Sequence, residues 1–180
     1  MTLADYKKKR DFKATKEPKP LRKKTVRSVL KKHLFVIQKH YATHLHYDFR
    51  LELNGILKSW AIPKGLAKST KEKRLGIQTE DHPLKYTMFE GEIQEGYYGA
   101  GKVIIWDKGE YINLKRNENG KEISLRKSLR EGHMEIWLFG KRFKGAYSLV
   151  HFKEKNWLFV KMNEKKLKAK LAKFGQSIPS

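Results

Sequence analysis

The chain has 180 residues and no cysteine, and its 41 Lys and Arg against 19 Asp and Glu give a formal net charge of +22. This length suits one domain with a hydrophobic core. The missing cysteines exclude disulfide frameworks and thiolate zinc sites, so any metal must be bound through nitrogen and oxygen. The charge predicts a polyanionic partner, with nucleic acid as the default. No apolar run approaches a membrane-spanning length and no signal peptide is recognisable, so we expect a cytoplasmic protein that does not bind membranes.

Residues 1–32 read as a basic N-terminal arm. They contain thirteen Lys or Arg and three acidic residues, and the segment 13–25 is rich in proline and charge. Such a segment has little to bury, which favours a mobile arm. The alternative is a solvated tail that only aids solubility.

Residues 33–163 have the sequence pattern of an all-β domain. Short runs of β-branched and aromatic residues alternate with turn formers, and Asn54-Gly55 between two runs predicts a type I′ hairpin. Many short strands at this spacing predict a barrel or a sandwich. Short helices are expected at 122–131 and 164–174, the second within a Lys-rich C-terminal tail, 164–180. The expected strands are HLFVIQ, THLHYDFRLEL, ILKSWAIP, RLGIQT, GKVIIWD, EYINLK, MEIWLFG, AYSLVHF and NWLFVKM.

The stretch 40–53, HYATHLHYDFRLEL, is the most informative part of the chain. As a strand it points successive side chains to opposite faces. The apolar face, expected in the core, comprises Leu45, Tyr47, Phe49, Leu51 and Leu53. The polar face comprises His44, His46, Asp48, Arg50 and Glu52, and we expect it to line a partly dry pocket of the barrel.

Three imidazoles and one carboxylate, His40, His44, His46 and Asp48, lie within nine positions. This ligand mix suits manganese, zinc or iron rather than calcium. Arg50, on the same face, can bind a phosphate beside the metal through its planar fork of donors. The alternatives are a polar strand face in water, histidines that touch phosphate directly, and an Arg50 that pairs with Glu52 or another carboxylate.

A second polar cluster, Glu80-Asp81-His82-Pro83, follows the run RLGIQT, with Tyr86 a short step further. Pro83 imposes an extended or turn conformation on His82, which therefore stands at a strand end. There it can donate a proton or a hydrogen bond to a phosphoryl oxygen, although a plain turn explains the pattern too. No helix pattern follows the glycines of GYYGAG, 96–101, so we interpret that segment as a hairpin loop without a phosphate-binding role.

Four long motifs carry a resemblance to a known family. They are FVIQKHYATHLHYDFRLELNGILKSWAIPKG, KRLGIQTEDHPLKY, FEGEIQEGYYGAGKVIIWDKG and LFGKRFKGAYSLVHF with NWLFVK. From about Lys9 to Lys161 the chain resembles the 3′-phosphoesterase domain of bacterial ligase D, the DNA end-joining repair enzyme, and its free-standing relatives. The chain has no room for ligase or polymerase modules, so we expect the free-standing form.

The resemblance implies a closed β-barrel with a few short flanking helices and a hydrolase that depends on manganese or another divalent transition metal. It implies action on DNA 3′ ends that carry ribonucleotides. A phosphodiesterase step removes the terminal ribonucleoside and leaves a 3′-phosphate, and a phosphomonoesterase step then leaves a 3′-hydroxyl. We expect a monomer that works beside a separate ligase and polymerase.

The resemblance also assigns roles to residues. It makes His40, which we place before the strand, a metal ligand and leaves His44 as a neighbour. The implied metal ligands are His40, His46 and Asp48; the implied phosphate-contacting residues are Arg50 and His82; Tyr86 is a further active-site residue; Gln38, Lys64, Arg74 and Glu80 line the pocket. Arg10 and Asp11, in the motif KKRDF, match an arm element associated chiefly with the diesterase step.

Two other functions stay open from the residues alone. A noncatalytic nucleic-acid binding module would use the same positive charge to bind the phosphate backbone of the nucleic acid in a salt-dependent way. A metal-binding structural barrel would need no substrate. The charge does not separate these alternatives, but the clustered histidines and Asp48 favour an enzyme.

Overall fold

The computed structural model describes residues 1–20 and 33–179. The strands are β1 His33–Tyr41, β2 Leu45–Leu53, β3 Ile56–Ile62, β4 Lys73–Pro83, β5 Gly91–Ile93, β6 Gly101–Asn113, β7 His133–Phe139, β8 Lys144–Lys153 and β9 Asn156–Lys161. The helices are α1 Leu3–Lys8, the 3-10 helix η1 Leu84–Met88, α2 Leu125–Arg130 and α3 Glu164–Ala172.

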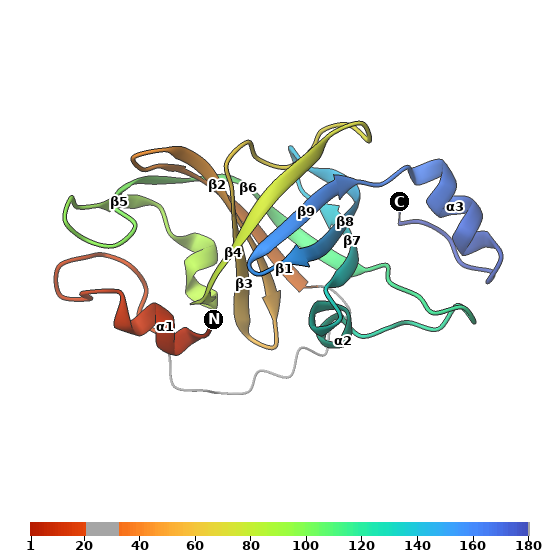
Figure 1. Ribbon diagram of the computed structural model, residues 1–180, viewed down its shortest axis with the longest axis horizontal. Coiled ribbons are helices and arrows are strands. Elements are labelled where there is room, and N and C mark those ends of the chain that lie inside the picture. The colour runs from red at the N-terminus through yellow and green to blue at the C-terminus, as the bar shows by residue number, and fades with distance from the viewer. Residues whose placement is uncertain (21–32, 180) are drawn as a thin grey trace.

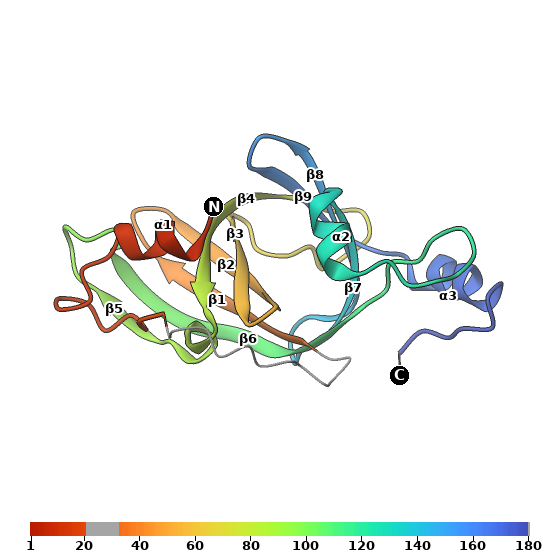
Figure 2. The same ribbon diagram turned by 90° about the horizontal axis from the view of Figure 1, so that it is seen from below.

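Within this described part of the chain, eight antiparallel strands close into a barrel. The order is β1-β2-β3-β4-β9-β8-β7-β6, and β6 pairs back onto β1. The first part of β6 also pairs with the short β5, whereas its last part pairs with β7. Figure 1 shows the barrel between α1 and β5 at one end and α3 at the other, and Figure 2 shows the same arrangement from below. The predicted all-β closed barrel with short helices is confirmed.

The predicted hairpin at Asn54-Gly55 joins β2 to β3. Both residues have positive φ, 55° and 79°, which is the conformation that a type I′ turn requires. The pairing that follows places Arg50 opposite Ser59 and Asp48 opposite Ala61. The turn thus fixes which residues of β3 lie beside the polar face of β2.

The interior of the barrel is one apolar cluster with contributions from strands all around it. The apolar face of β2 is part of it from Phe49 to Leu53, whereas Leu45, which we expected in the core, is 44% exposed at the end of the strand. The fully buried members include Phe35, Ile37, Phe49, Leu51, Trp60, Ile62, Tyr111, Met134, Ile136, Leu138, Tyr147, Leu149 and Phe159. Because side chains alternate along a strand, the polar residues between these positions face the outer side of the wall.

A second, smaller cluster packs against that outer side at one end of the barrel. It joins Tyr6 of α1, Tyr86 of η1 and Ile93 of β5 to Leu57 and Val103 of the wall. Helix α1 begins with a capping box between Thr2 and Asp5, and Tyr6 is completely buried. Residues 1–20 therefore pack on the barrel, which corrects the interpretation of this part of the arm as a mobile or merely solvated tail. Residues 21–32, the rest of the predicted arm, lie outside the described residues.

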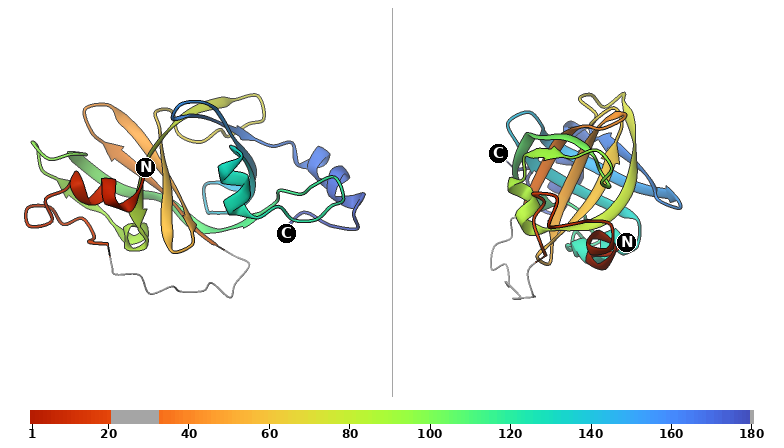
Figure 3. Two further views of the ribbon diagram at one scale, coloured as in Figure 1. Left: turned by 60° about the horizontal axis from the view of Figure 1, so that its bottom comes forward. Right: turned by 90° about the vertical axis from the view of Figure 1, so that its left-hand side faces the viewer.

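The C-terminal helix α3 lies at the opposite end of the barrel from α1, as the left-hand view of Figure 3 shows. Its Leu167 and Leu171 pack on Trp137 in a third apolar cluster, and Asn163 caps its first turn. The expected helices at 122–131 and 164–174 are confirmed in type and are shorter than predicted at one or both ends. Among the described residues, no helix is both long and apolar enough to span a membrane.

Two strands that we expected to be separate form a single strand in the structure. The runs at 101–107 and 110–115 form the single strand β6, in which Trp106 is the extra residue of a bulge opposite Ile37 and Gln38. The extra residue of a bulge interrupts the alternation of side chains between the two faces. A single strand therefore looks like two strands in the sequence pattern. Three short elements, α1, η1 and β5, were not predicted, and all three cover the polar outer face.

Candidate metal centre

Pairing of β1 with β2 brings the predicted metal ligands together. His40 lies within β1, not before a strand, and stands directly opposite His46, while Gln38 stands opposite Asp48. His40 Nδ1 is 3.4 Å from Asp48 Oδ2, and His46 Nε2 is 3.6 Å from Asp48 Oδ1. One ligand atom from each of the three residues lies within 4.8 Å of the other two. The group is therefore able to hold a metal ion.

The second nitrogen of each imidazole contacts a backbone carbonyl. His40 Nε2 is 2.9 Å from the oxygen of Gly99, and His46 Nδ1 is 2.9 Å from the oxygen of His44. A carbonyl only accepts, so these two nitrogens carry the protons and leave lone pairs on the nitrogens that face Asp48. This is the outer-shell arrangement by which proteins orient metal-binding histidines. The donor set and its orientation both fit a divalent transition metal.

His44 does not join this group. It lies exposed in the bend between β1 and β2, and only its backbone carbonyl contributes, by fixing His46. Our expectation that its side chain shares the face of His46 is wrong, because the strand begins only at Leu45. Alternation cannot be extended beyond the residues that pair.

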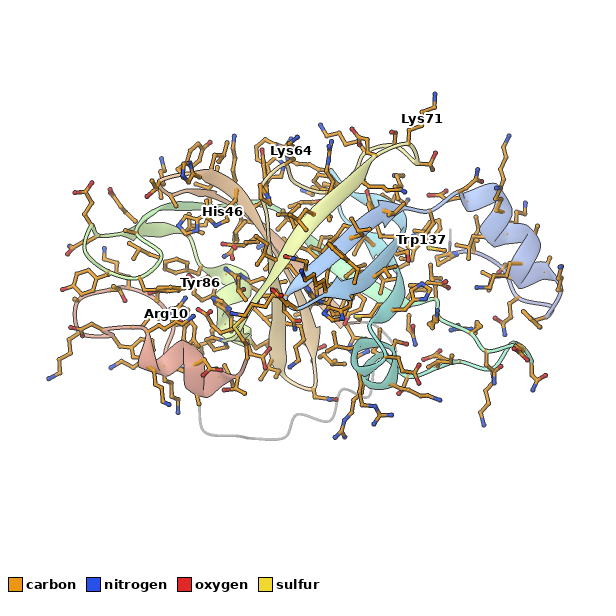
Figure 4. All side chains as sticks on the ribbon, viewed as in Figure 1. Arg10, His46, Lys64, Lys71, Tyr86 and Trp137 are labelled. Atoms are coloured by element: carbon orange, nitrogen blue, oxygen red, sulfur yellow. The ribbon has the colours of Figure 1, made fainter. Side chains whose placement is uncertain are left out.

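The site lies on the outer side of the barrel wall, not in a pocket inside the barrel. Its residues alternate with Ile37, Phe49 and Leu51, which fill the interior. The outer face is covered by η1, by the loop before β6 and by the arm, so Asp48 and Arg50 are buried although they point away from the barrel core. Figure 4 shows the labelled His46, Tyr86 and Arg10 gathered at this end of the molecule, with Trp137 at the other.

Arg50 is held by four neighbours at the base of the site. Its Nε donates to Gln38 Oε1 at 2.8 Å, one Nη lies 3.1 Å from Asp48 Oδ2, and the other lies 3.1 Å from His82 Nδ1. The guanidinium also stacks over the ring of Tyr86, 4.8 Å from its centroid. Its plane is therefore fixed beside the three candidate ligands.

The partner of Arg50 is Asp48 and not Glu52, which instead accepts from His33 and from a backbone N–H of the hairpin turn. Burial opposes ionisation of Asp48, but the Arg50 guanidinium and the adjacent imidazoles of His40 and His46 outweigh it and lower the pKa of the carboxyl group. Asp48 is thus ionised at any pH at which the protein would work, as a metal ligand must be.

His82 lies at the end of β4, between two guanidinium groups. Arg50 approaches its Nδ1 and Arg10 approaches its Nε2, at 3.1 and 3.4 Å, while the carbonyl of Glu80 and the hydroxyl of Ser59 also lie within 3.2 Å of Nδ1. Burial and these two cations lower the pKa of His82 well below its ordinary value. The Glu80 carbonyl only accepts, so a neutral His82 ring carries its proton on Nδ1 and presents Nε2 as an acceptor toward Arg10.

The N-terminal arm places Arg10 against this histidine. Arg10 forms ion pairs with Glu17 and Glu80 and stacks over the ring of Tyr6, and its side chain is almost fully buried. Glu17 also accepts a hydrogen bond from the Tyr86 hydroxyl at 3.0 Å. This network ties the arm, β4 and η1 into one polar wall of the site.

Glu17 was missed by the sequence analysis. It is buried, and Thr15 donates to its second oxygen. The available signal was weak: Glu17 is the single acidic residue between Asp11 and His33, in a stretch of Lys and Pro. Ser59, Tyr6 and Lys9 were also missed, because each reaches the site only through a long-range packing contact.

The remaining predicted residues fall into two groups. Gln38 and Glu80 belong to the site: the Gln38 amide donates to the carbonyls of Tyr86 and Phe89, and Glu80 binds Arg10. Lys64, Arg74 and Asp11 do not contact the histidine cluster in the described part of the chain. Lys64 lies in the exposed turn after β3, and Arg74 lies on the side of β4 opposite the site. Asp11 lies in an exposed turn of the arm, where its carboxylate accepts a hydrogen bond from the Lys13 N–H.

Comparison with known proteins identifies the family. Residues 38–151 match the family described as the DNA ligase D 3′-phosphoesterase domain. The chain is 43% identical over 169 residues to the multifunctional non-homologous end joining protein LigD of Pseudomonas aeruginosa, covering 90% of this chain and 19% of that protein. It is 41% identical over 164 residues to LigD of Mycolicibacterium smegmatis, covering 91% of this chain and 21% of that protein.

A third relative, the multifunctional non-homologous end joining DNA repair protein LigD of Mycobacterium tuberculosis, is 42% identical over 164 residues, with 91% of this chain and 20% of the relative covered. The chain thus spans about a fifth of the length of these curated relatives. The family match, residues 38–151, includes the metal centre and most of the strands of the barrel. This chain belongs to the DNA ligase D 3′-phosphoesterase domain family.

Proposed function

We propose that this protein is a manganese-dependent hydrolase that processes 3′ ends of DNA or primer-template strands carrying ribonucleotides. A phosphodiesterase step removes the terminal ribonucleoside and leaves a 3′-phosphate, and a phosphomonoesterase step converts that end to a 3′-hydroxyl. Such ends are ready for a separate polymerase or ligase in end-joining repair. The convergence of His40, His46 and Asp48 beside Arg50 carries this proposal.

The donor set supports manganese or another divalent transition metal. Two neutral imidazole nitrogens and one carboxylate leave coordination positions open, which separates this group from a closed structural site. A bound ion would act as a Lewis acid on a phosphoryl oxygen and stabilise the negative charge that develops there. His40, His46 and Asp48 would hold it.

Arg50 and His82 are the proposed phosphate-binding residues. The guanidinium fork of Arg50 matches two phosphoryl oxygens, and its burial reduces screening of the attraction by salt. His82 would enter the reaction neutral, with its one N–H directed at the Glu80 carbonyl. A phosphate anion against the ring would raise its pKa again, because an adjacent negative charge favours the imidazolium, so the bound substrate itself would prepare His82 to donate a proton.

The arm is proposed to serve the diesterase step. The two steps differ in the leaving group. In the first step the 5′-oxygen of the terminal ribonucleoside leaves the phosphorus, and in the second the 3′-oxygen of the strand leaves, which releases inorganic phosphate. Arg10 approaches His82 from the side of the arm, so it is placed to contact a group attached to the phosphate. Asp11 would act indirectly, because its carboxylate shapes the turn that presents Arg10 and its carbonyl accepts from Thr15, the neighbour of Glu17.

Gln38, Glu80 and Tyr86 would position these groups, each through the buried contacts described above. Lys64 and Arg74 remain predicted pocket residues. Lys64, exposed after β3, is able to reach a strand that extends beyond the site. The overall charge of +22 supports a polyanionic substrate and predicts affinity that falls with added salt.

The direct test is incubation with a labelled DNA strand that ends in one ribonucleotide, annealed to a template, with manganese and with a chelator. The proposal predicts a manganese-dependent product ending in 3′-phosphate, followed by one ending in 3′-hydroxyl. Binding of the strand without any product would support the noncatalytic module instead. If the protein neither bound the strand nor formed product, the result would support the structural barrel.

A further inference from the structure

The loop 94–100 between β5 and β6 is fixed against the metal centre. Its Tyr97 packs against the outer apolar cluster, and the Gly99 carbonyl contacts His40. Gly96 and Gly99 have φ of 87° and 79°, which side-chain-bearing residues rarely adopt, and backbone bonds from Tyr97 to Gln94 and from Ala100 to Tyr97 close the turns. The loop therefore presents its remaining side chains at a defined position.

Tyr98 is the aromatic residue that this loop directs outward. Lys9 donates to its hydroxyl at 3.3 Å, and the Lys9 Nζ and Arg10 Cζ atoms lie 4.5 and 5.0 Å from the centre of its ring. Both cations also bind Glu80. Despite these contacts, Tyr98 remains 48% exposed. A large aromatic surface thus stands open at the rim of the site, beside two of its cations.

An exposed ring next to cations matches the chemistry of a nucleotide, which joins a flat π-face to a phosphate. Proteins that bind single strands combine backbone-binding cations with aromatic residues on which bases stack, and such stacking tolerates any base. The cations polarise the same surface and are able to exchange their ring contact for a phosphate contact. The mere presence of an exposed tyrosine would not suggest this, but its position over Lys9 and Arg10 does.

We propose that Tyr98 is a nucleobase-stacking residue that receives a base flanking the phosphate bound at the metal centre. The inference rests on the proposed function for the identity of that phosphate. The base belongs to either the terminal nucleoside or the one before it. Stacking on Tyr98 makes recognition of the strand end independent of base identity, which suits an enzyme that processes ends of any sequence.

The competing explanation is that Tyr98 only fastens the arm to the loop through Lys9. It predicts that loss of the side chain loosens the arm and weakens binding of every strand to the same extent, with or without bases. It also predicts that the hydroxyl, which receives the Lys9 hydrogen bond, matters as much as the ring.

The test measures binding by fluorescence anisotropy without metal, so that no turnover occurs. The strands are an intact strand ending in a ribonucleotide, one abasic at its terminal residue and one abasic at the residue before it. The variants are Tyr98→Ala and Tyr98→Phe, with Phe152→Ala as the matched control, because Phe152 is a 52% exposed aromatic on β8.

The proposal predicts that Tyr98→Ala weakens binding of the intact strand by roughly 5- to 150-fold, the range for one lost base stack. Tyr98→Phe and Phe152→Ala should bind it as the unmodified protein does. On the strand that lacks the stacked base, the unmodified protein and Tyr98→Ala should bind equally, which identifies the base. Unchanged binding by Tyr98→Ala, equal losses on all three strands, or a Tyr98→Phe loss as large as that of Tyr98→Ala would overturn the proposal.

A parallel turnover assay of the unmodified protein with manganese separates this inference from the proposed function. Absence of product would refute the phosphoesterase proposal while the binding comparison still decides whether Tyr98 stacks on a base. Product formation together with strand-independent losses would retain the enzyme and reject the stacking role.

Discussion

The two sides of the candidate site are held in different ways. His40, His46, Asp48 and Arg50 sit on two paired strands, so backbone hydrogen bonds of the barrel fix their spacing. Arg10, in contrast, sits on an arm that is held by the burial of Tyr6 and by ion pairs. In the proposed function, the strand side would provide a rigid centre for chemistry that both steps share. The arm side would be able to serve one step only, because its geometry depends on a few side chains.

The largest effect should follow from changes on the strand side. His46→Ala or Asp48→Ala is expected to lower the rates of both steps by more than about 10²-fold, because the loss of outer-shell partners alone costs 10- to 100-fold in metal affinity. Rates on a ribonucleotide-ended strand and on a 3′-phosphate-ended strand would be compared.

His44→Ala is the matched control, since it removes an exposed imidazole two residues from His46. It should keep both rates. If folded His46→Ala protein turned over both strands as fast as His44→Ala, the shared-centre account would be wrong.

Replacement of His82, which lies between the two sides, should lower the reaction rate without changing metal binding. His82→Ala is expected to bind manganese normally and to lose roughly 10²-fold in the rate of both steps, the usual contribution of a positioned proton or hydrogen-bond donor. Titration calorimetry with manganese and single-turnover rates measure the two effects. Loss of metal binding in this variant would contradict the assigned role.

A change on the arm should be smaller and unequal between the steps. Arg10→Ala is expected to slow the diesterase step by about 10-fold, the value of one charge-assisted hydrogen bond, and to slow the monoesterase step less. Lys8→Ala, which removes an exposed cation from the same arm, is the control. Equal losses in both steps would remove the distinction between the two sides.

The smallest predicted effect concerns acid stability. Burial, Arg50 and Arg10 lower the folded-state pKa of His82 well below 6.5, so below that pH the unfolded chain binds a proton that the folded protein does not. The free energy of unfolding should therefore fall between pH 7.5 and pH 5.5. His82→Ala should show a smaller fall in urea unfolding, while His133, whose pKa is also lowered, contributes equally to both proteins.

A ring resonance of His82 that titrates near pH 6.5 in the folded protein would contradict this explanation. Asp48 does not contribute within this pH window, because its pKa is lowered from 3.8 and its stabilisation is lost only at lower pH.

The strand side could be predicted from the sequence because its information is local. Alternation of side chains places Asp48 and Arg50 on the opposite face from Phe49 and Leu51. Asn54-Gly55 predicts the hairpin turn that aligns β3 with β2. Alternation does not say which face is inside, however. It also cannot show that His40 and His46 are cross-strand partners, which depends on the register of β1 against β2.

The arm side could not be predicted from local patterns. The burial of Tyr6 and Glu17 arises from contacts with residues about seventy positions away, such as the Tyr86 hydroxyl on Glu17. A composition rich in Lys and Pro argues for a free arm, and the few apolar and acidic residues that anchor it are too sparse to form a period. The family resemblance pointed to Arg10, and the structure supplies the contacts that hold it.

The central claim is that His40, His46 and Asp48 bind one ion together. The most direct test is titration with manganese followed by electron paramagnetic resonance, in which bound and free ions are distinguished. The account predicts one tightly bound ion per chain in the unmodified protein and in His44→Ala, and none in His46→Ala or Asp48→Ala. An unchanged stoichiometry and affinity in folded His46→Ala and Asp48→Ala would contradict it.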